Sequence, residues 1–378
     1  MRITHIRAEN FRCIESVDLE LRPFNVVIGP NGAGKSSLLE LMNIFASIPK
    51  PGIASLFARW GGYSATVRYA APEPMLKVGI SGRTNANSFD LEVELFGEGP
   101  AFFVRAERLK LQSDSSNGEM VSFDREDDVA SFQVLQQKTR TNVGHSTEIA
   151  FPRILQSRPD IQKVLNTCMS SSIWKIHKFR PEGSVRGPQQ LQPTTIPSED
   201  GANLYSALYS MKTERRESFR RLVADLQTAV PELEELDFPL AGAGHVNLTW
   251  KQKDVSQVLY SNQLSDGTLR MIWLLTLLHS LPDDGLALID EPELSLHPEW
   301  VMLITSVLRK MSARMTIVAA TQSAELVRWL EPSELIIADV SDEGARFTRA
   351  DQRNDLDKWL EDFTLAQLWT MGELGGRR

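Results

Sequence analysis

One glycine-rich loop constrains the fold of this 378-residue chain more than any other feature. The largely apolar run 24–28 precedes the loop and the helix-forming segment 36–45 follows it, which predicts a strand, a loop and a helix in succession. The loop contains, in order, Gly29, Pro30, Asn31, Gly32, Ala33, Gly34, Lys35, Ser36 and Ser37. The spacing G-x-x-x-x-G-K-[ST] in this setting is typical of phosphate binding, because backbone N–H groups and the helix N-terminus face the anion. We expect Lys35 to reach the β and γ phosphates of a nucleotide and Ser36 to ligate Mg²⁺. A glycine turn with a chance lysine is the alternative, and the flanking strand and helix argue against it.

Two adjacent carboxylates follow the apolar segment 286–289. At the end of a buried strand beside a phosphate loop, Asp290 would hold Mg²⁺ through water. Glu291 would orient and deprotonate the water that attacks the γ-phosphate. An acidic strand-to-loop turn is the simpler interpretation of these two residues alone, but the phosphate loop on the same chain favours a catalytic pair.

A third motif, Ser265-Asp-Gly267, directly precedes a long apolar segment, 267–281, that predicts a helix. A hydroxyl and a glycine amide at a helix N-terminus form an anion site. The chain's own loop already accounts for one nucleotide, so we expect Ser265 and Gly267 to close on the nucleotide of a second subunit. A plain helix cap is the alternative.

The order of predicted elements indicates an α/β fold. Short alternating segments between 66 and 109 predict an antiparallel sheet. The βαβα order of 286–339, with a helix at 298–311, predicts a parallel one. We expect a loop-rich insertion at 112–147, helices at 159–169, 201–211 and 214–229, and a hairpin within 245–260. The chain is accordingly divided into 1–110 (first part of a head), 111–240 (a mostly helical insertion) and 241–378 (second part of the head).

Composition narrows the class of protein further. With 42% hydrophobic and 24% charged residues the chain is globular, and two cysteines cannot build a disulfide framework or a cysteine-rich metal site. The longest nearly apolar stretch, 271–281, is too short to span a membrane. The start lacks an apolar signal core, so we expect a cytoplasmic protein without membrane partners.

Charge is distributed unevenly along the chain. The net charge is −8, yet residues 153–221 hold 12 Lys and Arg against 6 Asp and Glu. A nucleic-acid surface would be served by phosphate contacts from basic side chains and a stacking aromatic ring, which this stretch offers in Lys175, Lys178, Arg180 and Arg186 near Trp174 and Phe179. A solvated helix face is the alternative, because Arg216 and Arg220 lie four residues apart along a predicted helix that also holds Glu214 and Glu217.

These motifs together resemble the ABC-type ATPases of the SMC, RecF and overcoming-lysogeny-defect (OLD) group, and most of all the stand-alone bacterial AAA family ATPases. The resemblance rests on the segments 6–12, 29–37, 264–270 and 289–298. It implies a P-loop NTPase head of the ABC/SMC type, with a mixed sheet lobe and a helical lobe, that binds ATP and Mg²⁺ and dimerises around two ATP molecules. It also implies that Ser265 and Gly267 contact the γ-phosphate of the opposite subunit. Residues 294–297 would cross that interface and bring His297 near the other site.

The chain departs from the group at one position, and one further residue of the group stays unassigned. Many relatives have a histidine after the next strand, where this chain has Gln322, which can hydrogen-bond to the phosphate or the water but carries no charge. Gln322 is therefore either a catalytic residue or a neutral strand-end cap. The glutamine that normally couples Mg²⁺ to the inserted region stays unassigned among Gln112, Gln133, Gln136 and Gln137.

Two functions from different classes compete. The first is an ATP-hydrolysing switch for a nucleic-acid-linked or anti-phage process. Only 39 residues follow Asp339, too few for the nuclease domain of OLD proteins, so we expect a separate effector, a nuclease or a toxin. The second is a regulatory scaffold that binds ATP and restrains a toxic effector. A transporter subunit is disfavoured by the RecF-like opening. The tail 356–374 has an aromatic stripe that we expect to dock on the chain's own sheet.

Overall fold

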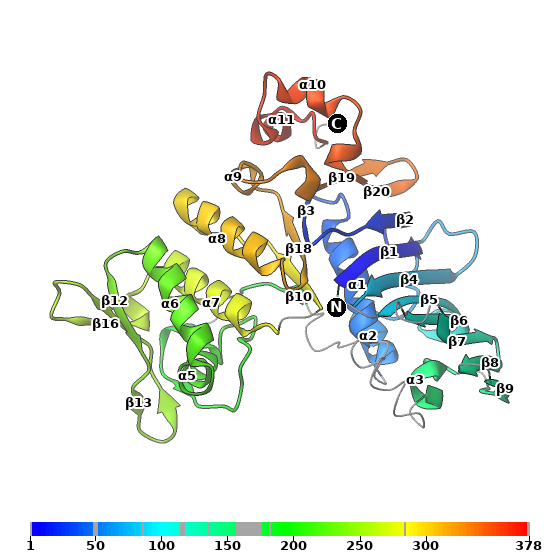
Figure 1. The fold of residues 1–378 in the computed structure, drawn as a ribbon, viewed down its shortest axis with the longest axis horizontal. Coiled ribbons are helices and arrows are strands. Elements are labelled where there is room, and N and C mark those ends of the chain that lie inside the picture. The colour runs from blue at the N-terminus through cyan, green and yellow to red at the C-terminus, as the bar shows by residue number, and fades with distance from the viewer. Residues whose placement is uncertain are drawn as a thin grey trace.

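The computed structural model describes residues 2–47, 52–84, 87–113, 118–134, 137–144, 146–155, 176–180, 183–282 and 285–375. Two sheets lie on one side of the molecule and a helical lobe on the other, with the C-terminal helices above the junction (Figure 1). The predicted helix 159–169, together with Cys168, Trp174 and Lys175, lies outside the described residues. Within the described residues, no helix combines the length and apolarity that membrane crossing requires.

The central sheet carries the motifs. Its strand order is β10-β17-β18-β3-β19-β20, parallel throughout except for the last pair. Its strands are β3 (Phe24–Ile28), β10 (Ile176–His177), β17 (Leu286–Asp290), β18 (Thr316–Thr321), β19 (Leu335–Ser341) and β20 (Gly344–Arg349). The parallel arrangement brings the carboxyl ends of β3, β17 and β18 to one edge, where the predicted site residues follow. The parallel sheet is therefore confirmed, whereas β20 was not predicted.

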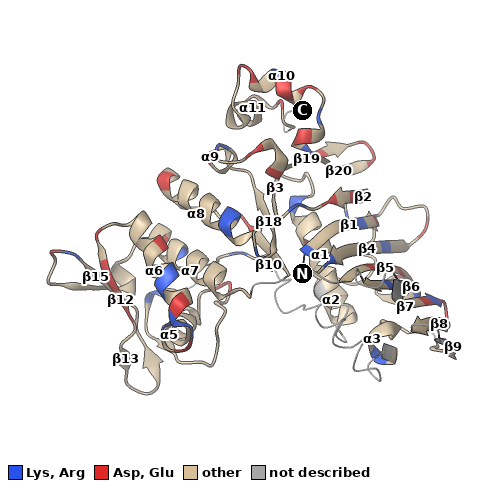
Figure 2. Ribbon diagram, in the orientation of Figure 1, with Lys and Arg blue, Asp and Glu red and all other residues tan. Residues whose placement is uncertain are grey.

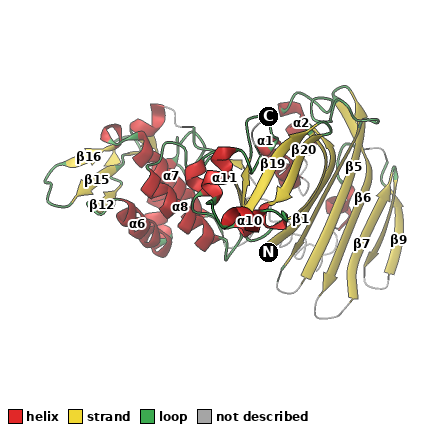
Figure 3. Ribbon diagram, turned by 90° about the horizontal axis from the view of Figure 1, so that it is seen from above, coloured by secondary structure: helices red, strands yellow, loops and turns green. Residues whose placement is uncertain are grey.

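The second sheet is antiparallel, with the order β2-β1-β4-β5-β6-β7-β8-β9 (Figure 3). The expectation of a loop-rich segment at 112–147 is wrong, because three strands of this sheet lie there and pair antiparallel in succession. The strands of the sheet are β1 (Arg2–Phe11), β2 (Ile14–Glu20), β4 (Met75–Arg83), β5 (Asn87–Glu98), β6 (Ala101–Ser113), β7 (Gly118–Glu126), β8 (Val129–Val134) and β9 (Gln137–Asn142).

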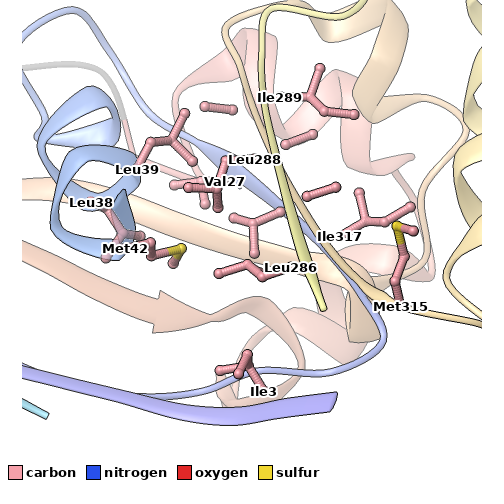
Figure 4. Packing of buried hydrophobic residues seen from close by; sticks show 14 of the residues in the cluster. Ile3, Val27, Leu38, Leu39, Met42, Leu286, Leu288, Ile289, Met315 and Ile317 are labelled. Atoms are coloured by element: carbon pink, nitrogen blue, oxygen red, sulfur yellow. The ribbon is translucent and has the colours of Figure 1, made fainter. Parts of the chain in front are cut away.

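The helix that follows the glycine loop, α1 (Lys35–Ser47), packs on the central sheet. Its apolar side chains Leu38, Leu39 and Met42 meet Val27 of β3 and the buried residues of β17 (Figure 4). All of these side chains are at most 1% exposed, so the start of α1 is fixed against the edge where the strands end. Two shorter helices, α2 (Ile53–Arg59) and α3 (Ala150–Leu155), were not predicted.

The helical lobe packs around α7 (Asp266–Ser280), of which twelve consecutive residues are buried. α6 contacts both α5 and α8, and a small antiparallel sheet pairs β12 with β15 and β15 with β16. The hairpin within 245–260 is thereby confirmed. The elements of the lobe are η1 (Gly183–Arg186), β11 (Gln189–Gln190), α5 (Leu204–Glu214), α6 (Arg216–Ala229), β12 (Leu233–Asp237), β13 (Leu240–Ala241), β14 (His245–Val246), β15 (Thr249–Gln252), β16 (Val258–Tyr260) and η2 (Ser261–Gln263).

The C-terminal part alternates between helices and the strands of the central sheet. The aromatic side chains of the tail pack against the chain's own core, and α11 contacts helix α9; docking on the sheet itself stays a prediction. The elements are α8 (Pro298–Met311), α9 (Ala324–Val327), η3 (Pro332–Glu334), η4 (Ala350–Gln352), α10 (Leu356–Leu360) and α11 (Leu365–Met371).

The three-part division of the chain stays a prediction. Its boundaries fall within strands, the first in β6 and the second in β13. The mostly helical character expected of 111–240 is wrong for its first part, which contains β7, β8 and β9.

Candidate functional site

The glycine loop follows β3 and opens α1, as predicted. The Lys35 side chain lies across the loop, where its Nζ donates to the carbonyl oxygens of Gly29 at 2.6 Å and Pro30 at 2.8 Å. Burial lowers the pKa of Lys35, and the negative charges of Asp290 and Glu291 oppose this shift. A buried ammonium held only by neutral carbonyls can transfer to a more negative group such as a phosphate.

Two glycines give the loop its shape for different reasons. Both Gly32 and Gly34 have a positive φ, of 82° and 89°, which residues with a side chain rarely adopt. A Cβ on Gly32 would meet no atom within 4 Å, whereas one on Gly34 would lie 2.7 Å from the Cβ of Ala345. The Ser36 side chain next to them is exposed and free to bind a ligand in front of the loop.

Asp290 ends β17, and Glu291 follows it at the same edge of the sheet. The Glu291 N–H donates to the carbonyl of Ala320 at 2.8 Å, and Glu291 has a positive φ of 49°. Such a backbone conformation costs a residue with a side chain about 1–3 kcal/mol and is maintained only by its surroundings. The structure therefore brings together Lys35, Ser36, Asp290 and Glu291 at one edge, as the sequence predicts.

Lys178 is a member of the site that the sequence analysis missed. It directly follows β10, whose pairing with β17 matches His177 with Ile289, so that Lys178 lies beside Asp290. Its Nζ lies 2.7 Å from Asp290 Oδ2 and 3.0 Å from Glu291 Oε2. Burial lowers the pKa of Lys178, but its hydrogen bonds to the two carboxylates outweigh burial and raise that pKa above the usual value.

A third carboxylate, Glu293, also lies close to the pair and was not predicted. Its Oε1 accepts a hydrogen bond from the Thr321 hydroxyl at 2.6 Å. Burial raises the pKa of Glu293, partly opposed by that hydrogen bond. Gln322 follows Thr321 with an exposed side chain, and its backbone carbonyl accepts from the Trp369 indole at 3.2 Å. The roles offered for Gln322, catalytic or capping, both stay predictions.

Ser265 and Gly267 lie at the start of α7, in the helical lobe. Ser265 caps α7, and its Oγ accepts from the Thr268 N–H at 3.1 Å, so the helix cap is confirmed. Contact of Ser265 with the nucleotide of a second subunit stays a prediction. A Cβ on Gly267 would lie 2.8 Å from the carbonyl of Ser295, so glycine permits a close approach of the 294–297 loop. The side chains of Ser265 and His297 are exposed, as a contact with a second subunit requires.

Arg270 connects the two groups. Its side chain is 5% exposed, and its Nη2 donates to the carbonyl of Glu291 at 2.7 Å. Its Nη1 donates to the carbonyl of Phe179 at 3.4 Å, and the guanidinium lies over the Phe179 ring. The helix that begins at the Ser265 motif is thus bonded directly to the backbone of the expected general base.

Several side chains of the basic stretch 153–221 are engaged within the chain. Arg186 donates to the carbonyl of Leu264 at 2.9 Å and pairs with Asp266. Phe179 is 3% exposed and stacks on Trp273, so the idea that it stacks on a base is wrong. Acidic and basic residues are mixed around α5 and α6 in Figure 2. A nucleic-acid surface in this stretch stays a prediction.

The glutamine that would couple Mg²⁺ to the inserted region stays unassigned. The residue beside Asp290 in the structure is Lys178. Gln112, Gln133 and Gln137 lie in β6, β8 and β9 of the antiparallel sheet, and Gln136 is outside the described residues. The sequence carried no signal for this position, because β10 is only two residues long.

The residues present fit a magnesium nucleotide. Ser36 and Asp290 offer the oxygen ligands that Mg²⁺ prefers. Within the part of the chain that the structure describes, no group of three His, Cys, Asp or Glu is arranged to hold a metal. Gly32, where a Cβ would meet no atom within 4 Å, leaves room for an anion against the loop N–H groups.

Protein families and curated proteins show what this chain is similar to. Residues 24–328 match the family described as "AAA domain, putative AbiEii toxin, Type IV TA system". A segment of 53 residues is 36% identical to the OLD nuclease of Thermus scotoductus, covering 14% of this chain and 10% of that protein. Another of 41 residues is 51% identical to the DNA replication and repair protein RecF of Erwinia tasmaniensis, covering 11% of each. The chain thus spans about a tenth of the length of these curated relatives.

Solved structures resemble the whole chain. The SMC head bound to the C-winged helix domain of ScpA has a TM-score of 0.55 at 13% identity, covering 92% of this chain and 97% of that one. The Smc head with an extended coiled coil, bound to the C-terminal domain of ScpA and derived from Pyrococcus furiosus, has a TM-score of 0.52 at 10% identity, covering 96% and 100%. At such identities the likeness shows the fold alone. The predicted α/β fold of the SMC head type is confirmed.

Proposed function

The chain belongs to the AAA domain family that matches residues 24–328, and we propose that it is a Mg²⁺-dependent ATPase that dimerises around two ATP molecules. The family, together with the OLD, RecF and SMC relatives, makes it a P-loop ATPase of that group. The main support for hydrolysis is that Lys35, Asp290 and Glu291 lie at one sheet edge. The two carboxylates are close enough to raise the pKa of Lys35 against the effect of its burial.

The proposed reaction is attack of water on the γ-phosphorus, with release of ADP. Glu291 orients the water and takes its proton, and Lys35 moves from the carbonyls of Gly29 and Pro30 to the β and γ oxygens. Ser36 and Asp290 would hold Mg²⁺, which neutralises phosphate charge when bound. Ser265 and Gly267 of a second subunit would complete the pocket, since both lie on an exposed helix start.

In the cell, we propose that this ATPase is cytoplasmic and switches a nucleic-acid-linked or anti-phage process through a separate effector. Support comes from the named relatives, an OLD nuclease and a DNA replication and repair protein, and from the toxin in the family description. A nuclease and a toxin both remain candidates for the effector.

Two substitutions test the ATPase. Glu291→Gln should bind ATP, hydrolyse it at least about a hundredfold more slowly, and accumulate dimers measured by light scattering. Lys35→Ala should bind no nucleotide. Glu217→Gln is the matched control, because Glu217 is 65% exposed on α6 in the helical lobe and belongs neither to the proposed site nor to the 294–297 loop. Parental hydrolysis by Glu291→Gln would show that Glu291 is not the base.

A regulatory scaffold is the second candidate, and the neutral Gln322 together with Lys178 on Glu291 favours it. Single-turnover ATP hydrolysis with and without DNA separates the two. A nucleic-acid-driven switch should accelerate with DNA, whereas a scaffold should not.

A further inference from the structure

Lys178 bonds at once to both carboxylates of the site. Its Nζ is 2.7 Å from Asp290 Oδ2 and 3.0 Å from Glu291 Oε2, and all three side chains are between 16% and 26% exposed. Partial burial makes such contacts stronger than those of a surface pair. The ammonium group therefore neutralises much of the repulsion between two adjacent negative charges.

The backbone under Lys178 is fixed by neighbouring elements, whereas its side chain is held at its tip by the two carboxylates. β10 pairs with β17 immediately before Lys178, and the carbonyl of Phe179 immediately after it accepts from Arg270. The lysine side chain is a flexible four-carbon stem that carries a single charge at its end. Lys178 can thus exchange its partners without a change in the fold.

The present partners of Lys178 are incompatible with the proposed reaction. A carboxylate oxygen that accepts from an ammonium group is a weaker ligand for a dication and a weaker base for a water molecule. Asp290 and Glu291 would each lose part of their proposed role while the contacts last. The triphosphate, in contrast, brings several negative oxygens to the same sheet edge and offers Lys178 a new partner.

We propose that Lys178 is a tethered cation that pairs with Asp290 and Glu291 in the nucleotide-free protein and leaves them when Mg²⁺ and nucleotide bind. This inference rests on the proposed ATPase function. Lys178 is a positioning residue in this scheme, because it acts through the two carboxylates. Because Lys178 competes for the two carboxylates, the protein needs a higher Mg²⁺ concentration to bind nucleotide than it would need without this lysine.

The test is a Mg²⁺ titration of the full chain with a fluorescent, non-hydrolysable ATP analogue. Lys178→Met should reach half-saturation at about tenfold less Mg²⁺ than the parent, since a competing charge-assisted contact is gone. Lys178→Arg keeps the charge and should retain the parental Mg²⁺ requirement. Lys212→Met is the matched control, because Lys212 forms a similar 2.7 Å pair with Asp237 in the helical lobe.

An unchanged or higher Mg²⁺ requirement in Lys178→Met would overturn the proposal, as would a folded Lys178→Met that binds no nucleotide. If Lys178→Met does not fold, Lys178→Gln is judged by the same criterion, since it keeps a donor but no charge. Failure of the parent itself to bind the analogue at any Mg²⁺ concentration would instead refute the proposed ATPase function.

Discussion

Replacing Arg270 with methionine should slow ATP hydrolysis while leaving nucleotide binding intact. The guanidinium is buried, and its 2.7 Å bond to the Glu291 carbonyl supports a residue with φ of 49°. A hydrogen bond from a charged group contributes about 1.5–3 kcal/mol, which is similar to the cost of about 1–3 kcal/mol for that φ. Without the bond Glu291 can relax away from its catalytic position. At about 1.4 kcal/mol for each tenfold change in rate, we expect kcat to fall roughly 10- to 150-fold.

The assay compares steady-state ATP hydrolysis with the affinity for a fluorescent nucleotide in the same variant. Arg309→Met is the matched control for lost stability. The Arg309 guanidinium also bonds a carbonyl, that of Trp329 at 2.8 Å, and pairs with Glu334. Urea unfolding of both variants shows whether they lose similar stability.

Two results would refute the reasoning about Arg270. One is a parental kcat in Arg270→Met, which would mean that its bond does not position Glu291. The other is an equal loss of kcat in Arg309→Met, which would mean that general destabilisation explains the effect.

Three further predictions concern the loop and two buried carboxylates. Gly34→Ala should lower the melting temperature and the nucleotide affinity more than Gly32→Ala. Both glycines have a positive φ, but only a Cβ on Gly34 would meet a neighbour, the Cβ of Ala345 at 2.7 Å. Equal effects of the two substitutions would contradict this. Glu107→Ala should cost about 3–5 kcal/mol in urea unfolding, since it leaves Arg125 buried and unpaired; a loss below about 1 kcal/mol would contradict this. Burial raises the pKa of Glu293 above its usual 4.5. Above pH 4.5 the folded state therefore keeps a proton that the unfolded state releases, so the free energy of unfolding falls as the pH rises. Glu293→Gln should therefore gain stability relative to the parent between pH 4.5 and 8 in urea unfolding, and an unchanged difference would count against it.

Much of the central sheet was predictable because its signals are local. The helix expected at 298–311 has the bounds of α8, since Pro298 starts it and a continuous amphipathic pattern follows. The strand-loop-helix unit of Lys35 was likewise predictable, because a buried strand and fixed glycine spacing lie next to each other in the chain. Such local signals also predicted the site residues Lys35, Ser36, Asp290 and Glu291.

The errors arose where pairing with distant residues decides the structure. β9 reads Gln-Lys-Thr-Arg-Thr-Asn and has no apolar alternation, so only its pairing with β8 makes it a strand. Lys178 was grouped with a basic stretch, because the two-residue β10 acquires its place from β17, more than a hundred residues later. Tertiary context overrides local propensity in both cases.

The bond from Arg270 to Glu291 has a consequence for how two sites would respond. In the proposed dimer, the helix start of one subunit touches the nucleotide of the other, and that same helix is bonded to its own general base. ATP binding in one pocket would then alter the rate of hydrolysis in the other. Hydrolysis should depend sigmoidally on ATP concentration, and Arg270→Met should make that dependence hyperbolic.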